Sequence, residues 1–290
     1  MLKITNRLSL RTRYFKHEAF TFYFLTPLLL FSCQSDLTVK QEDDNDIVAE
    51  IIPEVEEDDR VLVWSDEFDG TTLDLNNWSF ELGDGCPNLC GWGNNELQSY
   101  TDSNHRLEDG MLIISAKNEN EYTSTRILTK GKQEFTYGKI ETRVKVPSGA
   151  GLWPAFWALG GDIDTNSWPD CGEIDIMEYV GKNPGQIFTS VHTRSSYGNT
   201  VNTQITPVPN IEDDFHVFAI DWTENYIDFY LDESRVYRYA AQTQTAETWP
   251  FNKPFFLLIN LAIGGNFGGP VASSVQFPKE YLIDYVRVYQ

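Results

Sequence analysis

Three acidic side chains fall within six residues of an otherwise apolar segment, Gly172-Glu173-Ile174-Asp175-Ile176-Met177-Glu178-Tyr179. Carboxylates this close repel one another when all are ionised, so we expect one of them to hold a proton near neutral pH. A protonated carboxyl beside an ionised one is what combined general-acid and nucleophilic catalysis requires. The spacing therefore indicates Glu173, Asp175 and Glu178 as candidate catalytic residues. The simpler alternatives are a solvated edge strand and a cation site.

The segment that carries these acids has the composition of a β-strand. Because side chains on a strand alternate between two faces, Glu173 and Asp175 share one face, and the isoleucines beside them point to the other. Strict alternation would place Met177, not Glu178, on the acidic face, so we expect a one-residue bulge after Asp175. The bulge would bring two glutamates together. Retaining glycosidases hold their nucleophile and their general acid about 5–5.5 Å apart.

Short strands and turns, rather than helices, are expected to position these acids. Residues 140–146 alternate apolar with charged or polar side chains, which is the period of a strand, and no segment has amphipathic helical periodicity over three turns. Further strands are expected at residues 61–64, 111–116, 187–192, 215–222, 226–231, 255–262 and 282–289. Many short strands over ~230 residues predict an all-β domain, a β-sandwich jelly roll of two antiparallel sheets with a concave substrate cleft.

Composition restricts the ligands. The chain has 290 residues and a net charge of −21, which argues against nucleic acid or an anionic membrane surface as a partner, since both require Lys and Arg. The same charge disfavours a strongly anionic polysaccharide and leaves neutral polymers open. Aromatic residues make up 14% of the chain, and most of them must fill the core. The remainder are available to form sites for flat ligands such as sugar rings.

The first 59 residues differ from the rest. A basic start is followed by residues 19–32, which carry no charge and are too short for a membrane span. The run Leu30-Phe31-Ser32-Cys33 resembles a bacterial lipobox, so residues 1–32 are expected to be a lipoprotein signal peptide and Cys33 the lipidated residue; an ordinary signal peptide is the alternative. Residues 33–59 are rich in acids and contain only one Lys and no Arg, which predicts a flexible tether to a domain at 60–290.

The acidic strand also resembles a family signature. Glu-Ile-Asp-Ile-Met-Glu at 173–178 is similar to the motif of glycoside hydrolase family 16, the laminarinases, lichenases, agarases and carrageenases, and its spacing resembles the laminarinase and agarase branch. The resemblance extends in order over segments 64–70, 91–98, 136–141, 151–157, 260–265 and 284–289. It implies a retaining enzyme without an organic cofactor. Glu173 would be the nucleophile, Glu178 the general acid/base, and Asp175 a hydrogen-bonding partner that orients the nucleophile.

Eight residues near these motifs are candidates for sugar contact. They are Trp92, Asn95, Glu96, Arg126, Trp153, Trp157, Trp168 and His192. Trp153 and Trp168 lie in loop-like contexts and are expected to be the best platforms, whereas a core role for Trp157 is an equal alternative. Arg126 has a surface salt bridge as its alternative. By resemblance, His192 would lie beside the acid/base, with a purely structural role as the alternative.

The resemblance further implies one structural Ca²⁺ on the convex face, at positions matching Glu67, Gly110 and Asp284, held partly by backbone carbonyls. Export permits a disulfide among Cys86, Cys90 and Cys171, and either pairing of Cys90 leaves one free thiol.

The sequence thus predicts an endo-acting hydrolase of β-1,3-glucan such as laminarin, with mixed-linkage β-1,3/1,4-glucan as a second substrate. Alternatives are a hydrolase of another β-linked polysaccharide such as agarose, a transglycosylase, or a carbohydrate-binding lipoprotein without catalysis. We expect a monomer that contacts a membrane only through its lipid, at the outer membrane, with both exposure at the cell surface and the opposite leaflet left open.

Overall fold

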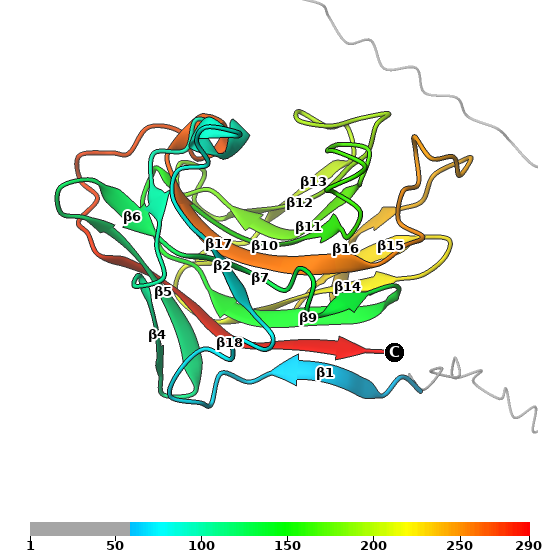
Figure 1. The fold of residues 1–290 in the computed structure, drawn as a ribbon, viewed down its shortest axis with the longest axis horizontal. Helices are drawn as coiled ribbons and strands as arrows, with labels where there is room; N and C mark the ends of the chain where they lie inside the picture. The colour runs from blue at the N-terminus through cyan, green and yellow to red at the C-terminus, as the bar shows by residue number, and fades with distance from the viewer. Residues whose placement is uncertain (1–58) are drawn as a thin grey trace, which may run out of the picture. The chain divides into compact units, whose positions relative to one another are not determined.

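Two β-sheets stacked face to face make up the computed structural model, which describes residues 59–290 (Figure 1). The predicted signal peptide, the lipidation site at Cys33 and almost all of the predicted tether lie outside the described residues. All paired strands are antiparallel except β3 and β6, so the predicted all-β sandwich of jelly-roll type is confirmed. No helix in the described part is long and apolar enough to cross a membrane.

The larger sheet follows the strand order β16-β15-β14-β9-β18-β5-β6-β3, with β1 paired to β18 and β4 to β5. Its strands are β1 (Leu62–Asp66), β3 (Ser99–Tyr100), β4 (His105–Glu108), β5 (Met111–Asn118), β6 (Tyr122–Ser124), β9 (Gly138–Lys145), β14 (His216–Trp222), β15 (Ile227–Leu231), β16 (Ser234–Tyr239) and β18 (Lys279–Tyr289).

The smaller sheet follows the order β13-β12-β11-β10-β17-β7-β2, with β8 paired to β17. Its strands are β2 (Ser79–Glu81), β7 (Arg126–Leu128), β8 (Glu134–Phe135), β10 (Leu152–Gly160), β11 (Glu173–Tyr179), β12 (Gln186–His192), β13 (Thr203–Pro207) and β17 (Phe255–Ile263). The 3-10 turn η1 (Cys90–Gly93) and the single α-helical turn α1 (Gly265–Gly268) are the helical elements among residues 59–290.

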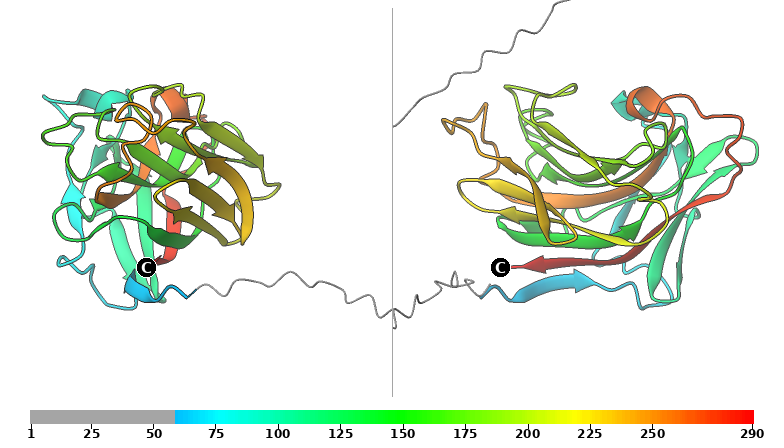
Figure 2. Two further views of the ribbon diagram at one scale, coloured as in Figure 1. Left: turned by 90° about the vertical axis from the view of Figure 1, so that its right-hand side faces the viewer. Right: turned by 180° about the vertical axis from the view of Figure 1, so that it is seen from behind.

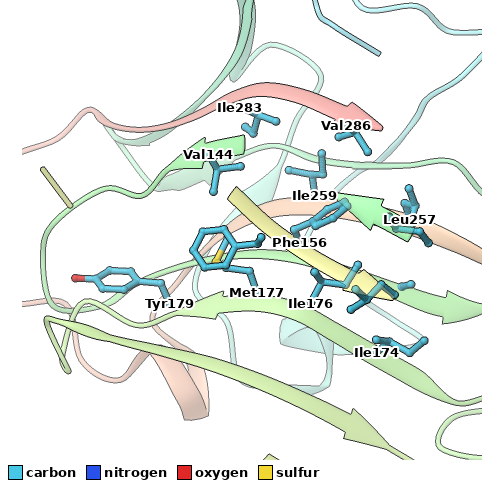
Figure 3. Packing of buried hydrophobic residues seen from close by; sticks show 14 of the residues in the cluster. Val144, Phe156, Ile174, Ile176, Met177, Tyr179, Leu257, Ile259, Ile283 and Val286 are labelled. Carbon is cyan, nitrogen blue, oxygen red and sulfur yellow. The ribbon is translucent and has the colours of Figure 1, made fainter. Parts of the chain in front are cut away.

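The main core lies between the two sheets. Figure 3 shows Val144, Ile283 and Val286 of the larger sheet facing Phe156 and Ile259 of the smaller one. Each of the eight strands expected from the sequence is present, with ends that differ by a few residues. The alternating pattern of residues 140–146 corresponds to β9, a strand in the middle of the larger sheet.

The predicted bulge is present in β11. Asp175 pairs with Ser190 of β12 and Glu178 with Phe188, so two residues of β11 lie opposite one residue of its partner strand. Ile176 and Met177 are both buried in the core, as Figure 3 shows. Because both of these apolar residues point inward, Glu178 returns to the face that carries Glu173 and Asp175.

This acidic face is the concave side of the smaller sheet. Figures 1 and 2 show loops that rise beyond the strand ends on both sides of it. The turns η1 and α1 lie at one side, and the loops 161–172 and 193–202 lie at the other. The acids of β11 therefore lie on the surface of the smaller sheet, between two groups of loops.

Candidate active site

A row of side chains crosses the concave face at right angles to the strands. Ala155 of β10 pairs with Glu178 on one side and with Asn260 of β17 on the other. Asn260 pairs in turn with Arg126 of β7, which pairs with Glu81 of β2. Strand register alone thus connects the acids at the centre of the sheet with the polar residues at its edge.

Glu173 accepts a hydrogen bond from the indole N–H of Trp168, which lies in the loop before β11. Burial raises the pKa of Glu173 to about 8, and the charge of Asp175 adds to the rise, while His192 and the Trp168 N–H act in the opposite direction. The group is thus surrounded by one donor that favours its ionised form and by negative neighbours that oppose ionisation. The ionisation of Glu173 therefore depends on its contacts with Trp168, Asp175 and His192.

Glu178 accepts a hydrogen bond of 2.9 Å from the indole N–H of Trp153 to its Oε1. Burial holds the pKa of Glu178 well above its usual range, and the charges of Asp175 and Glu173 raise it further. A buried carboxyl beside the charge of Asp175 keeps its proton at neutral pH, which suits a general acid. The predicted sharing of a proton within this cluster thus has a physical cause in burial and like charge.

His192 contacts Asp175 directly and is close enough to the predicted acid/base Glu178 for the two charges to interact. Its Nε2 is 3.0 Å from Oδ2 of Asp175, and the backbone N–H of Gly198 donates to Nδ1 at 3.1 Å. Burial opposes a charged imidazole, but the carboxylates of Asp175, Glu173 and Glu178 raise the pKa of His192 to about 9. The Gly198 N–H opposes this rise, because an amide can donate only to an unprotonated nitrogen, and it leaves Nε2 to donate to Asp175.

The same three groups are close enough to be considered as metal ligands. Donor atoms of Glu173, Asp175 and His192 lie within 4.8 Å of one another. However, Nε2 of His192 faces the Asp175 carboxylate and Nδ1 accepts from Gly198, so both ring nitrogens already have hydrogen-bond partners. The cluster therefore fits hydrogen-bonded acid–base chemistry better than metal binding.

Arg126 forms a salt bridge, but it is buried, with an exposed fraction of only 8%, rather than at the surface. Its guanidinium lies 4.8 Å from the ring centroids of both Trp92 and Trp157, and its Nε is 2.6 Å from Oε2 of Glu81. A planar cation between two indoles fixes both rings. Trp157 also donates from its indole N–H to Asn260 at 2.8 Å, so this tryptophan belongs to the concave face as well as to its apolar floor.

Glu96 lies in the loop after η1 and is surrounded by donors. Its carboxylate accepts from Gln98 at 2.6 Å and from the Tyr100 hydroxyl at 3.1 Å. Burial raises the pKa of Glu96, while the charge of Arg126 lowers it. Asn95 beside it is exposed and donates to Asn266 at 2.9 Å, which ties the loop to α1. Both residues therefore lie at the η1–α1 side of the concave face.

The disulfide joins Cys86 to Cys90, and Cys171 is a free, buried thiol. The bond closes the segment immediately before Trp92. Trp153 belongs to strand β10 and not to a loop, since β10 begins at Leu152. Trp168, by contrast, lies in a loop as expected and is 42% exposed.

The positions predicted for calcium lie around β18. Glu67 follows β1 and Gly110 precedes β5, and both strands pair with β18, which carries Asp284 at a bulge. The carboxylate of Glu67 accepts two hydrogen bonds from Arg287, and that of Asp284 is 2.6 Å from Arg143. The acidic side chains are thus already paired with guanidinium groups, and a cation here would rely on backbone carbonyls.

Some polar residues of the site carried no recognised signal in the sequence. Asn260 and Tyr100 are hydrogen-bonded to each other at 3.1 Å and extend the network to Glu96. Asn260 is the single polar side chain in the buried strand β17, and a polar residue inside an apolar run is the signal that could have identified it. Phe267 packs edge-on against Trp153, and no periodic pattern indicates this contact.

Comparisons with known proteins bear on this arrangement. The family described as "Glycosyl hydrolases family 16" matches residues 92–286. The chain is 44% identical over 248 residues to a "Beta-glucanase" of Rhodothermus marinus, covering 79% of this chain and 85% of that protein. It is 38% identical over 256 residues to a "Glucan endo-1,3-beta-glucosidase" of Cryptopygus antarcticus, with 78% and 91% covered. The crystal structure of a laminarinase from Flavobacterium sp. UMI-01 matches with a TM-score of 0.78 and 56% identity, over 79% of this chain and 100% of that one.

Proposed function

Because this chain belongs to the glycosyl hydrolases of family 16, we propose that it hydrolyses internal β-1,3 bonds of a neutral glucan such as laminarin, with retention of anomeric configuration. Mixed-linkage β-1,3/1,4-glucan is the second substrate. The observation that supports this most is the placement of Glu173 and Glu178 on one concave face, each beneath an indole N–H. The names of the relatives at 44% and 38% identity supply the glucan and the linkage.

In the first step, the Glu173 carboxylate attacks the anomeric carbon while Glu178 donates its proton to the glycosidic oxygen. The bond from the anomeric carbon to that oxygen breaks, and the glucan chain on the far side leaves as an alcohol. The product is a glycosyl ester of Glu173. Burial and like charge keep the proton on Glu178 until this step, since they raise its pKa.

In the second step, Glu178 is ionised and accepts a proton from water as that water attacks the anomeric carbon. The ester bond to Glu173 breaks, and the carboxylate and protonated Glu178 are restored. Asp175 lies between the two glutamates in the strand, and its carboxylate acts on the ionisation of both. Its charge disfavours a second charge on either neighbour, so a change of ionisation at one glutamate is felt at the other.

The same site favours a neutral polymer over a sulfated one. Arg126 is a cation of the concave face, and it is enclosed by two indoles and paired with Glu81. The charge of Arg126 is thus already balanced by Glu81, which weakens its attraction for an ester sulfate. Together with the net charge of −21, this argues for glucose polymers rather than carrageenan-like substrates.

The test is reducing-sugar release from laminarin, lichenan, agarose and κ-carrageenan by the wild type and by Glu173→Ser. Activity on laminarin that is lost in the variant supports the proposal. Activity on agarose alone keeps the mechanism and overturns the substrate. Wild-type protein that binds laminarin and releases no sugar overturns catalysis and favours the binding lipoprotein.

We also propose attachment to the outer membrane, at the cell surface, through a lipid on Cys33, from the lipobox-like run 30–33 and the acidic segment that follows it. In a Gram-negative host, the full-length protein should partition into the detergent phase, and Cys33→Ser should appear in the aqueous phase. Protease treatment of intact cells then reports whether the domain is exposed. Equal partitioning of both variants would contradict lipidation.

A structural calcium ion near Glu67, Gly110 and Asp284 is a further proposal that follows from family membership. It would be held by backbone oxygens and by the Asp284 carboxylate, in competition with Arg143. Added Ca²⁺ should raise the melting temperature of chelator-treated protein, and Asp284→Asn should remove that increase. An unchanged melting temperature would exclude a stabilising ion.

A further inference from the structure

Tyr197 is an exposed aromatic residue that neither the acid–base chemistry nor the sequence motifs involve. It lies in the loop 193–202 between β12 and β13, and 53% of its surface is exposed. Its ring meets the ring of Trp168 edge-on, with centroids 5.3 Å apart and an interplanar angle of 81°. Trp168 in turn donates its indole N–H to Glu173. A short chain of contacts therefore leads from Tyr197 to the nucleophile.

The loop that carries Tyr197 is held rigidly by its own polar groups. Thr193 and Ser196 exchange backbone hydrogen bonds of 2.9 and 3.0 Å. The hydroxyl of Ser196 contacts that of Thr200 at 2.9 Å and accepts from the backbone of Val201 at 3.0 Å. Gly198, directly after Tyr197, donates to His192 at 3.1 Å, which fastens the loop to β12. Such a loop can hold a side chain in one place.

The ring of Trp168 is partly exposed and contacts side chains outside its own loop. Trp168 is 42% exposed. Its ring contacts the ring of Tyr197 and also that of His192, with centroids 6.1 Å apart in the second pair. An exposed ion pair of 3.4 Å between Arg194 and Asp170 also links the two loops, but exposed pairs contribute little. Edge-to-face aromatic pairs contribute about 0.5–1.5 kcal/mol beyond area burial. The ring of Tyr197 is the closer of these two aromatic neighbours of Trp168, with centroids 5.3 Å apart against 6.1 Å for His192.

We propose that Tyr197 is a positioning residue for the nucleophile: its ring holds the Trp168 indole so that the indole N–H points at Glu173. The proposal rests on the proposed function, in which Glu173 attacks the anomeric carbon. Without this support the indole rotates away, and Glu173 loses its neutral hydrogen-bond donor. The remaining groups that face Glu173 are Asp175 and Glu178 on its own strand, His192 on β12 and Cys171 in the preceding loop.

The expected consequence is a defect in the reaction rather than in substrate binding. The Trp168 N–H stabilises ionised Glu173 and lowers its pKa, so its loss raises that pKa. Tyr197→Ala should therefore reduce kcat on laminarin about tenfold, as expected for a misplaced catalytic group. The acidic limb of the pH profile of kcat/KM should move to higher pH. Tyr197→Phe retains the ring and should stay within about twofold of wild type.

A double-mutant cycle separates action through Trp168 from an independent role. Trp168→Phe removes the indole N–H, so adding Tyr197→Ala to it should cause no further loss of kcat and no further pH shift. The control is Val201→Ala, which changes an 86% exposed apolar side chain of the same loop and should leave kcat and the profile unchanged. Melting temperatures of all variants identify any that fail to fold.

Three results would overturn the proposal. These are an unchanged kcat and pH profile in Tyr197→Ala, a change confined to KM, and additive losses in the double variant. A change in KM alone would make Tyr197 a sugar contact. A wild type inactive on every glucan would instead contradict the proposed function, which the first measurement of the series shows independently of any Tyr197 variant.

Discussion

Glu173 and Glu178 face the same side of β11 although five positions separate them, because an extra residue in the bulge restores the parity of the strand. Both side chains then meet indole N–H groups that come from opposite sides of the concave face, Trp168 from the loop before β11 and Trp153 from β10. A retaining mechanism needs one ionised and one protonated carboxyl near the same bond. The bulge makes both glutamates face the concave side, and burial raises the pKa of Glu178 so that it keeps its proton.

The two glutamates should give different products when an added nucleophile replaces the lost group. In Glu173→Ala, azide attacks the anomeric carbon directly from the face that the glutamate occupied, so an activated β-glycosyl substrate gives the α-azide. In Glu178→Ala, azide attacks the glycosyl ester of Glu173 and gives the β-azide. The measurement is the configuration of the azide product by NMR. Exchanged configurations would reverse the assigned roles.

Loss of the acid should depend on the leaving group. Glu178→Ala should lower kcat/KM on laminarin by about 10²–10⁴, since a sugar alcohol leaves poorly without a proton. On an aryl glycoside with an acidic phenol, the loss of kcat/KM should be much smaller, because that phenolate leaves unaided. Glu173→Ala should abolish both reactions equally and provides the control. Equal losses on both substrates in Glu178→Ala would contradict its role as general acid.

Stability should depend on pH through Glu173. Burial and Asp175 raise its pKa from the ordinary value of 4.5 to about 8, so the folded state binds the proton more tightly than the unfolded state. Its contribution to stability is therefore fully present below about pH 4.5 and is lost as pH rises through about 8. Glu173→Gln, which cannot ionise, should raise the melting temperature more at pH 8 than at pH 4.

The matched control for this prediction is Glu121→Gln, at an exposed position after β5. It should change the melting temperature little, and equally at both pH values. A larger gain for Glu173→Gln at pH 4 than at pH 8 would reverse the sign of the linkage and exclude a raised pKa. Thermal denaturation followed by circular dichroism in matched ionic strength gives the comparison.

Arg126 should matter for both stability and substrate binding. Arg126→Met leaves the partly exposed Glu81 without its cation. It also removes the planar guanidinium that lies between the indoles of Trp92 and Trp157. We expect a loss of about 1–3 kcal/mol in unfolding free energy, discounted for the exposure of Glu81. KM on laminarin should rise several-fold, with kcat little changed, because Trp92 and Trp157 lose their common support.

A second substitution tests the cause. Glu81→Gln added to Arg126→Met should recover part of the stability, since no unpaired carboxylate remains, but it should not recover KM. Arg126→Lys keeps the charge without the planar stack and should restore stability more than KM. A fall in kcat with an unchanged KM would argue against a role in substrate binding for Arg126 and the two indoles that it contacts.

The disulfide should affect binding more than folding. Cys86 and Cys90 are four positions apart, so opening the bond gives the unfolded chain little additional conformational entropy. The corresponding loss of unfolding free energy is about 2 kcal/mol for so short a loop. The bond lies next to Trp92 and constrains the loop that continues to Glu96. Cys86→Ser with Cys90→Ser should raise KM several-fold and shift the melting temperature modestly. Reductant on the wild type should reproduce this result, since Cys171 is buried.

Local chain chemistry determined much of this protein. Period-two alternation predicted β9, and the apolar runs predicted β5, β12 and β17, because burial on one or both faces is written directly into the residue order. The three acids and the need for a bulge followed from strand parity. Family resemblance supplied the roles of the glutamates and the glucan.

Tertiary structure decided which distant groups touch. Arg126 is buried between Trp92 and Trp157, and His192 faces Asp175, because sheet register brings β7, β10, β11 and β12 into one surface. The pairing of Cys86 with Cys90 depends on a turn that composition does not specify. The contact of Tyr197 with Trp168 joins two loops far apart in sequence. Such contacts arise from packing between elements, and a single sequence records no signal for them.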